Sequence, residues 1–590
     1  MIAVPSRPRR VWLTALVLAV VGGWPSAQAQ TPSAPEGRSG WHAAAVGRAS
    51  RMMISAANPL AVDAGLDILR RGGNAIDAAV TVQLVLNLVE PQSSGLGGGA
   101  LALYWDAGAA KLESFDGREM APAAARPDQF LRDGVPIPFR AAVLSGKSIG
   151  VPGTLHLLET LHRRKGRLPW RDVIAPAQHL AEVGFPISAR LHALLAQTSA
   201  DTFQPAARAY FYDRLGSPRP QGYVLRNPEF AATLAKIANA GADAFYTGDI
   251  AARIVAAAAA VPGAAGEMSR EDLARYRTAE RAPLCSTYRG FKVCGMGPPS
   301  SGGIAIAQVL SLIEPFDLGA APADALRPGA LHLIAEAEKL AYADRDRYVA
   351  DSDFVALPPG LTDADYLNER RTMIDAGKVM QRPQPGHPRR VGARPMGVDE
   401  THEIAGTSHF SIVDAERNVL AFTTTIEAGF GSRVWAAGFL LNNEMTDFSA
   451  RPVDGTGTPI ANAIAPGKRP RSSMSPTIVF DAQGKPWATL GSVGGQRIPL
   501  YVTKALIALI DWKLDAQQAA ALLNFGSRGG AFEIENDQPR ALWPALVLKG
   551  KGPRIAADAL TSGTHIIVLR GDDGLEGGAD PRREGIARGD

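Results

Sequence analysis

Hydrophobic and polar positions divide the start of the chain into two helices of different character. Pro59 stands at a first-turn position, and residues 60–71 are predicted to form a helix that ends at a glycine pair. Asn74 caps a second predicted helix, to about Leu88, with apolar residues on nearly every face. A helix of that kind is buried, so the two helices should cover one face of a layered fold.

The pattern changes to extended structure after residues 375–406, a stretch rich in proline and arginine without periodicity, which is the best boundary in the chain. Beyond it, residues 410–413 and 419–426 are predicted to be strands of a hairpin. Thr407 stands at the mouth of the first strand, after a flexible glycine. Cleavage of the 406–407 bond would give it a hydroxyl and a free α-amine, whose ordinary pKa of about 7.7–8.0 suits a base. The alternative is an ordinary threonine on a surface strand.

Length and charge limit the class of protein. The 590 residues are 46% hydrophobic and 20% charged, as in a globular protein with more than one domain-sized core or one large layered fold. The formal net charge of +4 is close to balance. No run of lysine and arginine is interleaved with aromatic residues, so we expect no nucleic-acid partner.

The N-terminus has the pattern of a signal peptide, which we assign to residues 1–29. Three arginines precede an apolar run, residues 11–21, and Ala27-Gln28-Ala29 is an A-x-A cleavage site. The run is short for a transmembrane helix, although an uncleaved anchor is the alternative. We therefore expect cleavage after Ala29, a periplasmic or secreted protein, and no membrane span after signal removal.

The two cysteines, Cys285 and Cys294, are predicted to form a disulfide. If Arg289-Gly290 is a two-residue hairpin loop, counting outward places the cysteines opposite each other at a non-hydrogen-bonded pair. That position brings the Cα atoms close enough for the bond, which an exported protein permits.

Two glycine motifs suggest other chemistries. Residues 93–100 contain the spacing of a dinucleotide-binding fingerprint, but a predicted helix precedes them and a strand follows, so a tight, closely packed turn is the better interpretation. Residues 146–150 match the G-x-S-x-G nucleophile elbow. Val151-Pro152-Gly153 separates that serine from the next predicted helix, which argues against an elbow.

Further candidate residues follow strands or begin helices. Arg118, just past a predicted strand, could bind a carboxylate or form a surface ion pair. Residues 491–497 place glycines at the start of a long apolar helix, where free amides suit an oxyanion, although a plain turn gives the same pattern. His409 is interpreted as a packed or hydrogen-bonded neighbour of Thr407. No zinc signature is present, and we expect no metal or other cofactor.

Seven motifs, in order along the chain, resemble those of the γ-glutamyltransferase family, whose members have an N-terminal nucleophile hydrolase fold. The similarity extends from about Ala45 to the C-terminus. The motifs are Gly-Gly-Asn-Ala-Ile-Asp-Ala-Ala-Val, Ser-Gly-Leu-Gly-Gly-Gly, Gly-Arg-Glu-Met-Ala-Pro, Gly-Thr-Ser-His-Phe-Ser, Leu-Leu-Asn-Asn-Glu-Met-Thr-Asp-Phe, Arg-Ser-Ser-Met-Ser-Pro and Gly-Ser-Val-Gly-Gly.

The resemblance implies an α+β fold, a four-layer αββα sandwich, assembled from two chains of one self-cleaving precursor. Those chains would be a large one, residues 30–406, and a small catalytic one, residues 407–590, paired without a covalent link. Thr407 would form an acyl-enzyme with a γ-glutamyl donor such as glutathione, and water or an acceptor amine would release the product.

The resemblance also implies a role for each matching residue. Thr425 would orient the nucleophile, and Gly494 and Gly495 would supply oxyanion-hole amides. The substrate α-carboxylate would bind one set of residues and the α-ammonium another. The first set is Arg118, Ser472 and Ser473, and the second is Glu444 and Asp447.

The implied site suits a zwitterion, because a guanidinium with two hydroxyls lies apart from two carboxylates. Glu427 departs from the asparagine common at that position and adds a third carboxylate. The loop 450–471 is another departure, since it could be shorter than the active-site lid of some members. Two alternatives stay open: an acylase of the same fold acting on glutaryl or other side chains, of the cephalosporin acylase type, and an uncleaved binding or scaffold protein.

Overall fold

The computed structural model describes residues 1, 40–388, 396–401, 406–535, 555–558, 560–571 and 574–590. The predicted signal peptide and its cleavage site lie outside the described residues. Among the described residues, the helices are all too short or too polar to cross a membrane.

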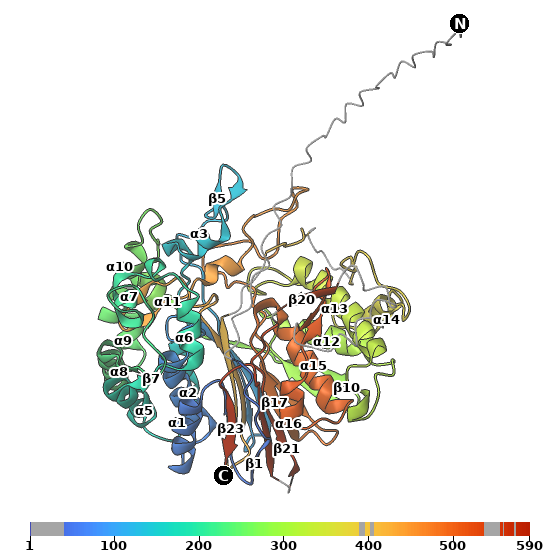
Figure 1. Ribbon diagram of the computed structural model, residues 1–590, viewed down its shortest axis with the longest axis horizontal. Helices are drawn as coiled ribbons and strands as arrows, with labels where there is room; N and C mark the ends of the chain where they lie inside the picture. The colour runs from blue at the N-terminus through green and yellow to red at the C-terminus, as the bar shows by residue number, and fades with distance from the viewer. Residues whose placement is uncertain (2–39, 389–395, 402–405, 536–554, 559, 572–573) are drawn as a thin grey trace.

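Two seven-stranded antiparallel sheets form the centre of the molecule (Figure 1). The first sheet has the order β1 (Gly47–Ala49), β22 (Leu575–Ala579), β21 (His565–Leu569), β17 (Pro486–Gly491), β16 (Thr477–Phe480), β11 (Phe291–Gly295) and β10 (Leu284–Tyr288). The second has the order β23 (Ile586–Gly589), β2 (Met53–Ala56), β12 (Thr407–Val413), β13 (Val419–Thr425), β3 (Gly99–Asp106), β4 (Lys111–Gly117) and β9 (Ala279–Arg281).

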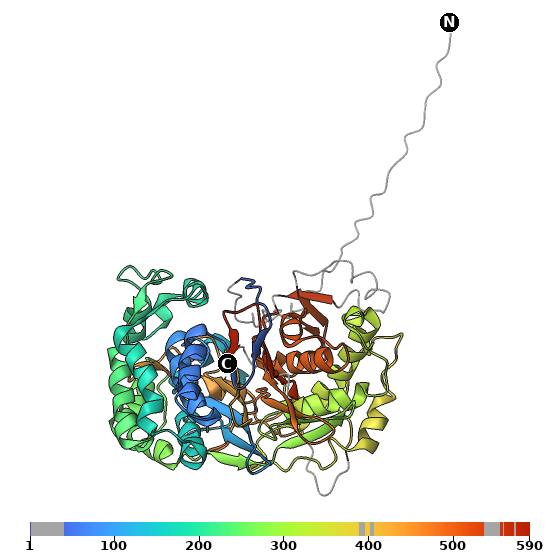
Figure 2. The same ribbon diagram turned by 90° about the horizontal axis from the view of Figure 1, so that it is seen from below.

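Helices cover the outer faces of both sheets, so the layers read αββα (Figures 1 and 2). On the second sheet lie α1 (Pro59–Arg70), α2 (Ala75–Val89), α4 (Thr154–Lys165), α5 (Trp170–Val183) and α8 (Pro228–Ala240). On the first lie α12 (Gly302–Ile313), α13 (Pro328–Tyr348), α15 (Ile498–Ile510) and α16 (Ala516–Ala521). Between the sheets, Leu103 and Val413 of one pack in the same cluster as Leu490 of the other. The predicted fold class is confirmed.

The described residues also form further α-helices and strands. The helices are α3 (Phe139–Val143), α6 (Ala189–Ala196), α7 (Pro205–Phe211), α9 (Asp243–Tyr246), α10 (Asp249–Ala259), α11 (Arg270–Arg275) and α14 (Ala364–Arg371). The strands are β5 (Leu131–Arg132), β6 (Val135–Pro136), β7 (Phe185–Pro186), β8 (Val224–Leu225), β14 (Trp435–Ala436), β15 (Phe439–Leu440), β18 (Phe525–Gly526), β19 (Phe532–Glu535) and β20 (Ile555–Asp558).

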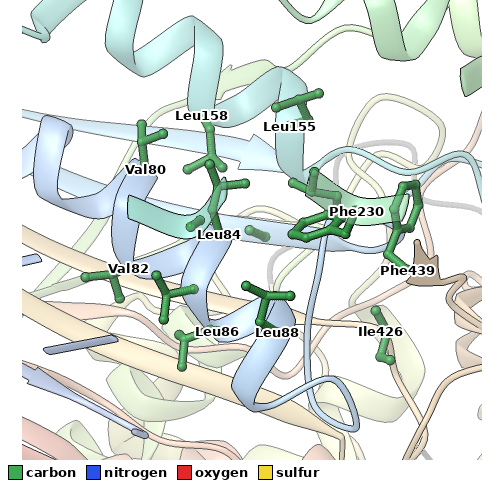
Figure 3. Packing of buried hydrophobic residues seen from close by; sticks show 14 of the residues in the cluster. Val80, Val82, Leu84, Leu86, Leu88, Leu155, Leu158, Phe230, Ile426 and Phe439 are labelled. Atoms are coloured by element: carbon green, nitrogen blue, oxygen red, sulfur yellow. The ribbon is translucent and has the colours of Figure 1, made fainter. Parts of the chain in front are cut away.

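Helix α2 explains why the amino-terminal pattern is so apolar. All fifteen of its residues are buried, and Leu84 and Leu88 lie among side chains of α4, α8 and β15 (Figure 3). Asn74 caps its start by accepting from the Asp77 amide at 3.1 Å, as predicted. Replacing one such buried leucine by alanine typically lowers the free energy of unfolding by about 2–5 kcal/mol. Packing of α2 therefore contributes strongly to the stability of the second sheet.

The cysteine hairpin and the first glycine motif are confirmed in detail. Cys285 and Cys294 are paired across β10 and β11 and disulfide-bonded, and the loop residues Arg289 and Gly290 have φ of 49° and 84°. At Gly98 a Cβ would lie 1.9 Å from the Thr425 carbonyl oxygen. The glycine turn is therefore a close backbone contact beside β13 and not a nucleotide loop.

The second glycine motif is not a nucleophile elbow. Residues Gly146–Ser148 form a 3-10 turn, and Ser148 is buried with its hydroxyl donating to the carbonyls of Val143 and Ser145. A hydroxyl held in this way does not project from a strand end toward a substrate.

Both sheets interleave strands from the two sides of the 406–407 bond. In the second sheet β12 pairs with β2, and β13 pairs with β3. In the first, β16 pairs with β11. The parts of the chain before and after that bond are therefore joined by sheet hydrogen bonds and share two cores.

Candidate active site

Thr407 is the first residue of β12 and lies directly opposite Thr425 at the end of β13. It is 3% exposed. The Thr425 hydroxyl donates to the Gly406 carbonyl oxygen at 2.7 Å and accepts from the Glu427 amide at 2.8 Å. A hydrogen bond to that oxygen draws electron density from the carbonyl carbon of the 406–407 bond, which makes it a better electrophile.

Gly406 meets a steric requirement at the same place. A Cβ there would lie 2.1 Å from the Glu427 carbonyl oxygen. Glycine is therefore the residue that allows the chain to pass so close to the segment after β13.

His409, two residues after Thr407 on β12, is confirmed as a packed and hydrogen-bonded residue of the sheet. Its Nδ1 lies 2.8 Å from the Thr423 hydroxyl, and its Nε2 lies 3.2 Å from the Ser411 hydroxyl. Complete burial holds the pKa of His409 well below its usual value, so the ring is neutral at physiological pH. Its partners are strand hydroxyls, which assigns it to packing within the sheet.

Arg118 lies at the centre of a buried charged cluster, which we define as Arg118, Glu119, Glu444 and Asp447. Its guanidinium binds Glu444 directly, donates to Asp447 at 2.5 Å and lies 3.6 Å from Glu119. It also donates to the Arg471 carbonyl oxygen at 2.9 Å. All four side chains are at most 6% exposed. The alternative of a surface ion pair for Arg118 is therefore wrong.

The Arg118 cluster holds more negative groups than positive ones, and its carboxyl pKa values reflect this. Burial raises the pKa of Glu119 to about 7, with Arg118 opposing the rise. Burial also raises the pKa of Glu444 well above its usual value, and Glu119 and Glu427 add to that effect. The cluster therefore favours binding of a further positive charge.

The expected separation between the guanidinium and the carboxylates is not found. Among the described residues, Arg118 pairs with Glu444 and Asp447, which were assigned to the opposite end of the substrate. Ser472 accepts from the Met474 amide at 3.1 Å, and Ser473 accepts from Arg345 at 2.8 Å. A buried guanidinium requires counter-charges, and the acidic residues of the 3-10 turn Glu444–Asp447 lie within its reach.

Two asparagines that the sequence analysis did not single out connect the site. Asn442 donates to the carbonyls of Gly97 and Gly150 at 2.7 and 2.9 Å, which joins the two glycine loops. Asn443 donates to the Glu427 carboxylate at 2.7 Å. Both residues lie inside a quoted motif, so their position was visible in the sequence but their partners were not.

Gly494 and Gly495 lie between β17 and α15, where their φ angles of 140° and 56° suit glycine. A Cβ at Gly494 would lie 2.5 Å from the Tyr501 ring. At the end of β17, a Cβ on Gly491 would lie 2.3 Å from the His409 ring. The glycine turn therefore begins beside β12, the strand that Thr407 opens.

Comparison with known proteins agrees with this geometry. Residues 61–589 match the family model described as Gamma-glutamyltranspeptidase. The chain is 35% identical to the glutathione hydrolase proenzyme of Bacillus subtilis (strain 168), over 98% of this chain and 99% of the relative. It is 33% identical to the acylase ACY 1 proenzyme of Pseudomonas sp. (strain V22), over 91% and 93%.

A solved structure supports the fold in the same way. The crystal structure of cephalosporin acylase from Bacillus halodurans aligns with a TM-score of 0.79 and 27% identity, over 92% of this chain and 97% of that chain. The fold is thus the N-terminal nucleophile hydrolase sandwich, and the relatives include both hydrolases and acylases. From the family match and the near full-length relatives, this chain belongs to the gamma-glutamyltranspeptidase family.

Proposed function

We propose that this protein is an exported γ-glutamyltransferase and hydrolase that cleaves γ-glutamyl amides such as glutathione. The single observation that carries the proposal is the contact at the 406–407 bond. There Thr425 donates to the carbonyl of Gly406, and the next residue, Thr407, opens the central strand with its own hydroxyl. The name of the Bacillus subtilis relative, a glutathione hydrolase proenzyme, supports the same activity.

The first step of the proposal is self-cleavage. The Thr407 hydroxyl oxygen attacks the Gly406 carbonyl carbon, and the C–N bond breaks as the Thr407 nitrogen takes up a proton. Water then hydrolyses the resulting ester, which frees the hydroxyl and leaves an α-amine on Thr407. Thr425 stabilises the developing negative charge on the Gly406 oxygen.

The interleaved sheets support a stable two-chain product. Residues 30–406 and 407–590 would remain paired because β2 and β3 flank β12 and β13. Relatives named as proenzymes fit such a precursor.

Turnover would then use the same oxygen. The α-amine of Thr407 accepts the hydroxyl proton, the oxygen attacks the γ-carbonyl of the donor, and the amine product leaves with that proton. Gly494 and Gly495 amides would stabilise the oxyanion. Water or an acceptor amine would release the γ-glutamyl group from the ester.

The donor head would bind the Arg118 cluster and its neighbours. Arg118 would bind the α-carboxylate, with Ser472 and Ser473 nearby. Glu444 and Asp447, supported by Glu427, would bind the α-ammonium. A zwitterionic donor could replace the existing Arg118–Asp447 ion pair, because its carboxylate can pair with Arg118 while its ammonium pairs with Asp447.

The second candidate is an acylase, which the similarity to cephalosporin acylase favours. A glutaryl group carries a carboxylate but no ammonium. Entering the Arg118 cluster, it would add negative charge where three carboxyl groups already surround one guanidinium. This charge balance favours the γ-glutamyl substrate.

The test uses purified protein and two anilide substrates. Cleaved material should give a small fragment that begins Thr-Ser-His-Phe, and γ-glutamyl anilide should turn over at least tenfold faster than glutaryl anilide. Thr407→Ala should stay one band and be inactive, whereas Thr407→Ser, which keeps a hydroxyl, should still cleave. Faster glutaryl turnover would favour the acylase, and intact wild-type protein without activity would favour a scaffold. Cell fractionation tests export.

A further inference from the structure

A buried arginine lies beside Thr407 on a segment that crosses between the two sheets. Residues 580–585 connect β22 of the first sheet to β23 of the second. Arg583 on this segment is 1% exposed. Its Nη1 donates to the Thr407 carbonyl oxygen at 3.5 Å, and its Nε donates to the Ser562 carbonyl oxygen at 3.2 Å. The crossing segment thus places a guanidinium against the main chain of the nucleophile residue.

The side chain of Arg583 also packs beside Gly563 and Val493, the residue before the Gly494–Gly495 turn. A Cβ on Gly563 would lie 2.8 Å from Arg583 Cδ and 2.8 Å from Val493 Cγ2, so these three residues are packed without space for a side chain. Val493 directly precedes Gly494. Arg583 is therefore packed against residues next to the Gly494–Gly495 turn. Its side chain cannot move away from Thr407 unless Gly563 or Val493 moves as well.

Cleavage of the 406–407 bond would turn the Thr407 nitrogen into an amine near this cation. The nitrogen and carbonyl oxygen of one residue are about 3 Å apart, so the new amine would lie within roughly 7 Å of the guanidinium. A positive neighbour at that range favours the neutral form of an amine, which is the form that accepts the hydroxyl proton.

The other titratable groups around this end of β12 do not supply that effect. His409 on β12 and His565 on β21 stack with ring centres 6.4 Å apart, and burial lowers the pKa of both, to about 4 for His565. Strand β2 has no titratable side chain. At the C-cap of α2, Glu90 lies 3.6 Å from Arg190.

Acidic groups near this end are also engaged. Asp580 pairs with Arg582 at 3.0 Å and accepts from Ser562, and Glu427 accepts from Asn443. Glu584 accepts from the Arg190 amide at 2.8 Å. Arg583 is the cation whose side chain reaches the Thr407 main chain in the described part of the structure.

We propose that Arg583 is a positioning residue that fixes the Thr407 carbonyl and keeps the α-amine of Thr407 in its basic form. The proposal rests on the proposed function, since it assigns a role toward the amine that cleavage creates. It explains why a charged residue is buried beside a nucleophile that must lose a proton to its own amine.

The experiment compares pH profiles of kcat/KM for γ-glutamyl anilide in four proteins: wild type, R583Q, R583K and R588Q. R583Q removes the charge and keeps a donor, whereas R583K keeps the charge. Arg588 on β23 is exposed and paired with Asp63, so R588Q is a matched loss of one positive charge from the same end of the chain. The fraction of each protein that is cleaved is measured alongside.

The acid limb of R583Q should move up by about 1 pH unit, with activity about tenfold lower than wild type below the limb and within about threefold on the high-pH plateau. R583K and R588Q should keep the wild-type limb within about 0.3 unit. If R583Q stays uncleaved while R583K cleaves, rescue by charge also supports the proposal.

Two outcomes would overturn it. One is a cleaved R583Q with an unchanged acid limb, and the other is failure of both R583Q and R583K to cleave, which would confine Arg583 to folding. Wild-type protein that neither cleaves nor turns over the anilide contradicts the proposed function instead, so the two failures are distinguishable.

Discussion

Two buried arginines, Arg118 and Arg582, differ in how their charge is balanced. Arg118 has three carboxyl groups around it: Glu119, Glu444 and Asp447. Arg582 forms a second group, which we call the Arg582 cluster, with Glu535, Asp580 and Lys504. Arg582 donates to both Glu535 oxygens at 2.6 Å and to Asp580 at 3.0 Å, and the Lys504 amine donates to Asn524 at 2.7 Å. The second cluster therefore pairs two basic groups with two acidic ones.

The pKa values separate the two clusters in the same way. In the Arg118 cluster, burial outweighs the single guanidinium, and the pKa of Glu119 rises to about 7. In the Arg582 cluster, burial acts to raise the pKa of Asp580, but Arg582 and Lys504 outweigh it and lower the pKa to about 2. A surplus of buried like charge is costly unless a ligand balances it, whereas a balanced cluster is complete by itself. The difference in charge balance supports the proposed binding role of the Arg118 cluster and assigns the Arg582 cluster to the stability of the fold.

The largest effect on turnover should come from Arg118→Gln. The variant leaves three carboxyl groups without their cation and removes the proposed partner of the donor carboxylate, so kcat/KM should fall by about 10³ or more. Arg582→Gln should instead lower the free energy of unfolding by about 3–5 kcal/mol, because it leaves buried carboxylates unpaired. Kinetics and urea unfolding on both variants measure the contrast. A comparable loss of kcat/KM in properly folded Arg582→Gln would break the comparison.

A smaller effect is expected for Asp447→Asn. Loss of one charge from the proposed ammonium site should raise KM for γ-glutamyl anilide by about 10–100-fold and reduce the enzyme's preference for γ-glutamyl anilide over glutaryl anilide. Unfolding stability should fall less than in the matched variant of the Arg582 cluster, because Glu119 and Glu444 remain beside Arg118.

The matched variant in the balanced cluster is Asp580→Asn. The pKa of Asp580 is depressed in the folded state, so its contribution of about 2 kcal/mol is present above its unfolded pKa and is lost as the pH falls through about 2. At pH 7 the variant should therefore be less stable by about that amount. Equal stability changes in the two variants would contradict the distinction between the clusters.

The sequence predicts elements whose signals are local. The ends of α1 and α2 and the cysteine register depend on caps, glycines or counting along a hairpin. The Arg118–Glu444 pair joins residues 326 positions apart, and no local pattern shows that these two side chains meet.

Burial explains the other differences from the sequence analysis. Glu119 lies next to Arg118 in a quoted motif, yet only the packed structure shows that its side chain is fully buried and packed against Gly99. The position of Arg583 was likewise not visible in the sequence, since its contact with Thr407 depends on the segment that crosses between the two sheets. Tertiary packing, not propensity, decides which of many charged residues meet.

Glu119→Gln should change binding by a few-fold, and only at high pH. With a folded pKa of about 7, Glu119 is largely protonated at pH 6 and ionised at pH 8. The variant should therefore bind the donor normally at pH 6 and show a KM a few-fold higher at pH 8, where it lacks one negative charge near the ammonium.

The unfolding stability of Glu119→Gln gives an independent check, because the variant should bind the donor less well at pH 8 but be more stable than wild type. Because the folded pKa is raised, wild type loses stability as pH increases from about 4.5 to 7, whereas the variant does not. By pH 8 the variant should be more stable by on the order of 1–3 kcal/mol. Urea unfolding at pH 4.5 and pH 8 measures this, and a variant less stable than wild type at pH 8 would show that Glu119 is not in surplus.

The smallest effect on turnover should come from Lys504→Met, in the balanced cluster. Burial, assisted by Arg582, lowers the pKa of Lys504 to about 7, so the folded protein holds a neutral amine over a range where the unfolded chain holds an ammonium. The neutral amine still donates to Leu522 and Asn524, both at 2.7 Å. Stability of wild type should accordingly rise with pH between about 7 and 10.5 through this group.

Lys504→Met removes that pH dependence. Relative to the variant, wild type should lose about 2 kcal/mol of unfolding free energy between pH 9 and pH 7, measured by urea unfolding at both values. The kcat/KM for γ-glutamyl anilide should stay within about twofold. If Lys504→Met lowered turnover as strongly as Asp447→Asn, charge balance would not distinguish structure from binding, because a change in the balanced cluster would then act on the substrate.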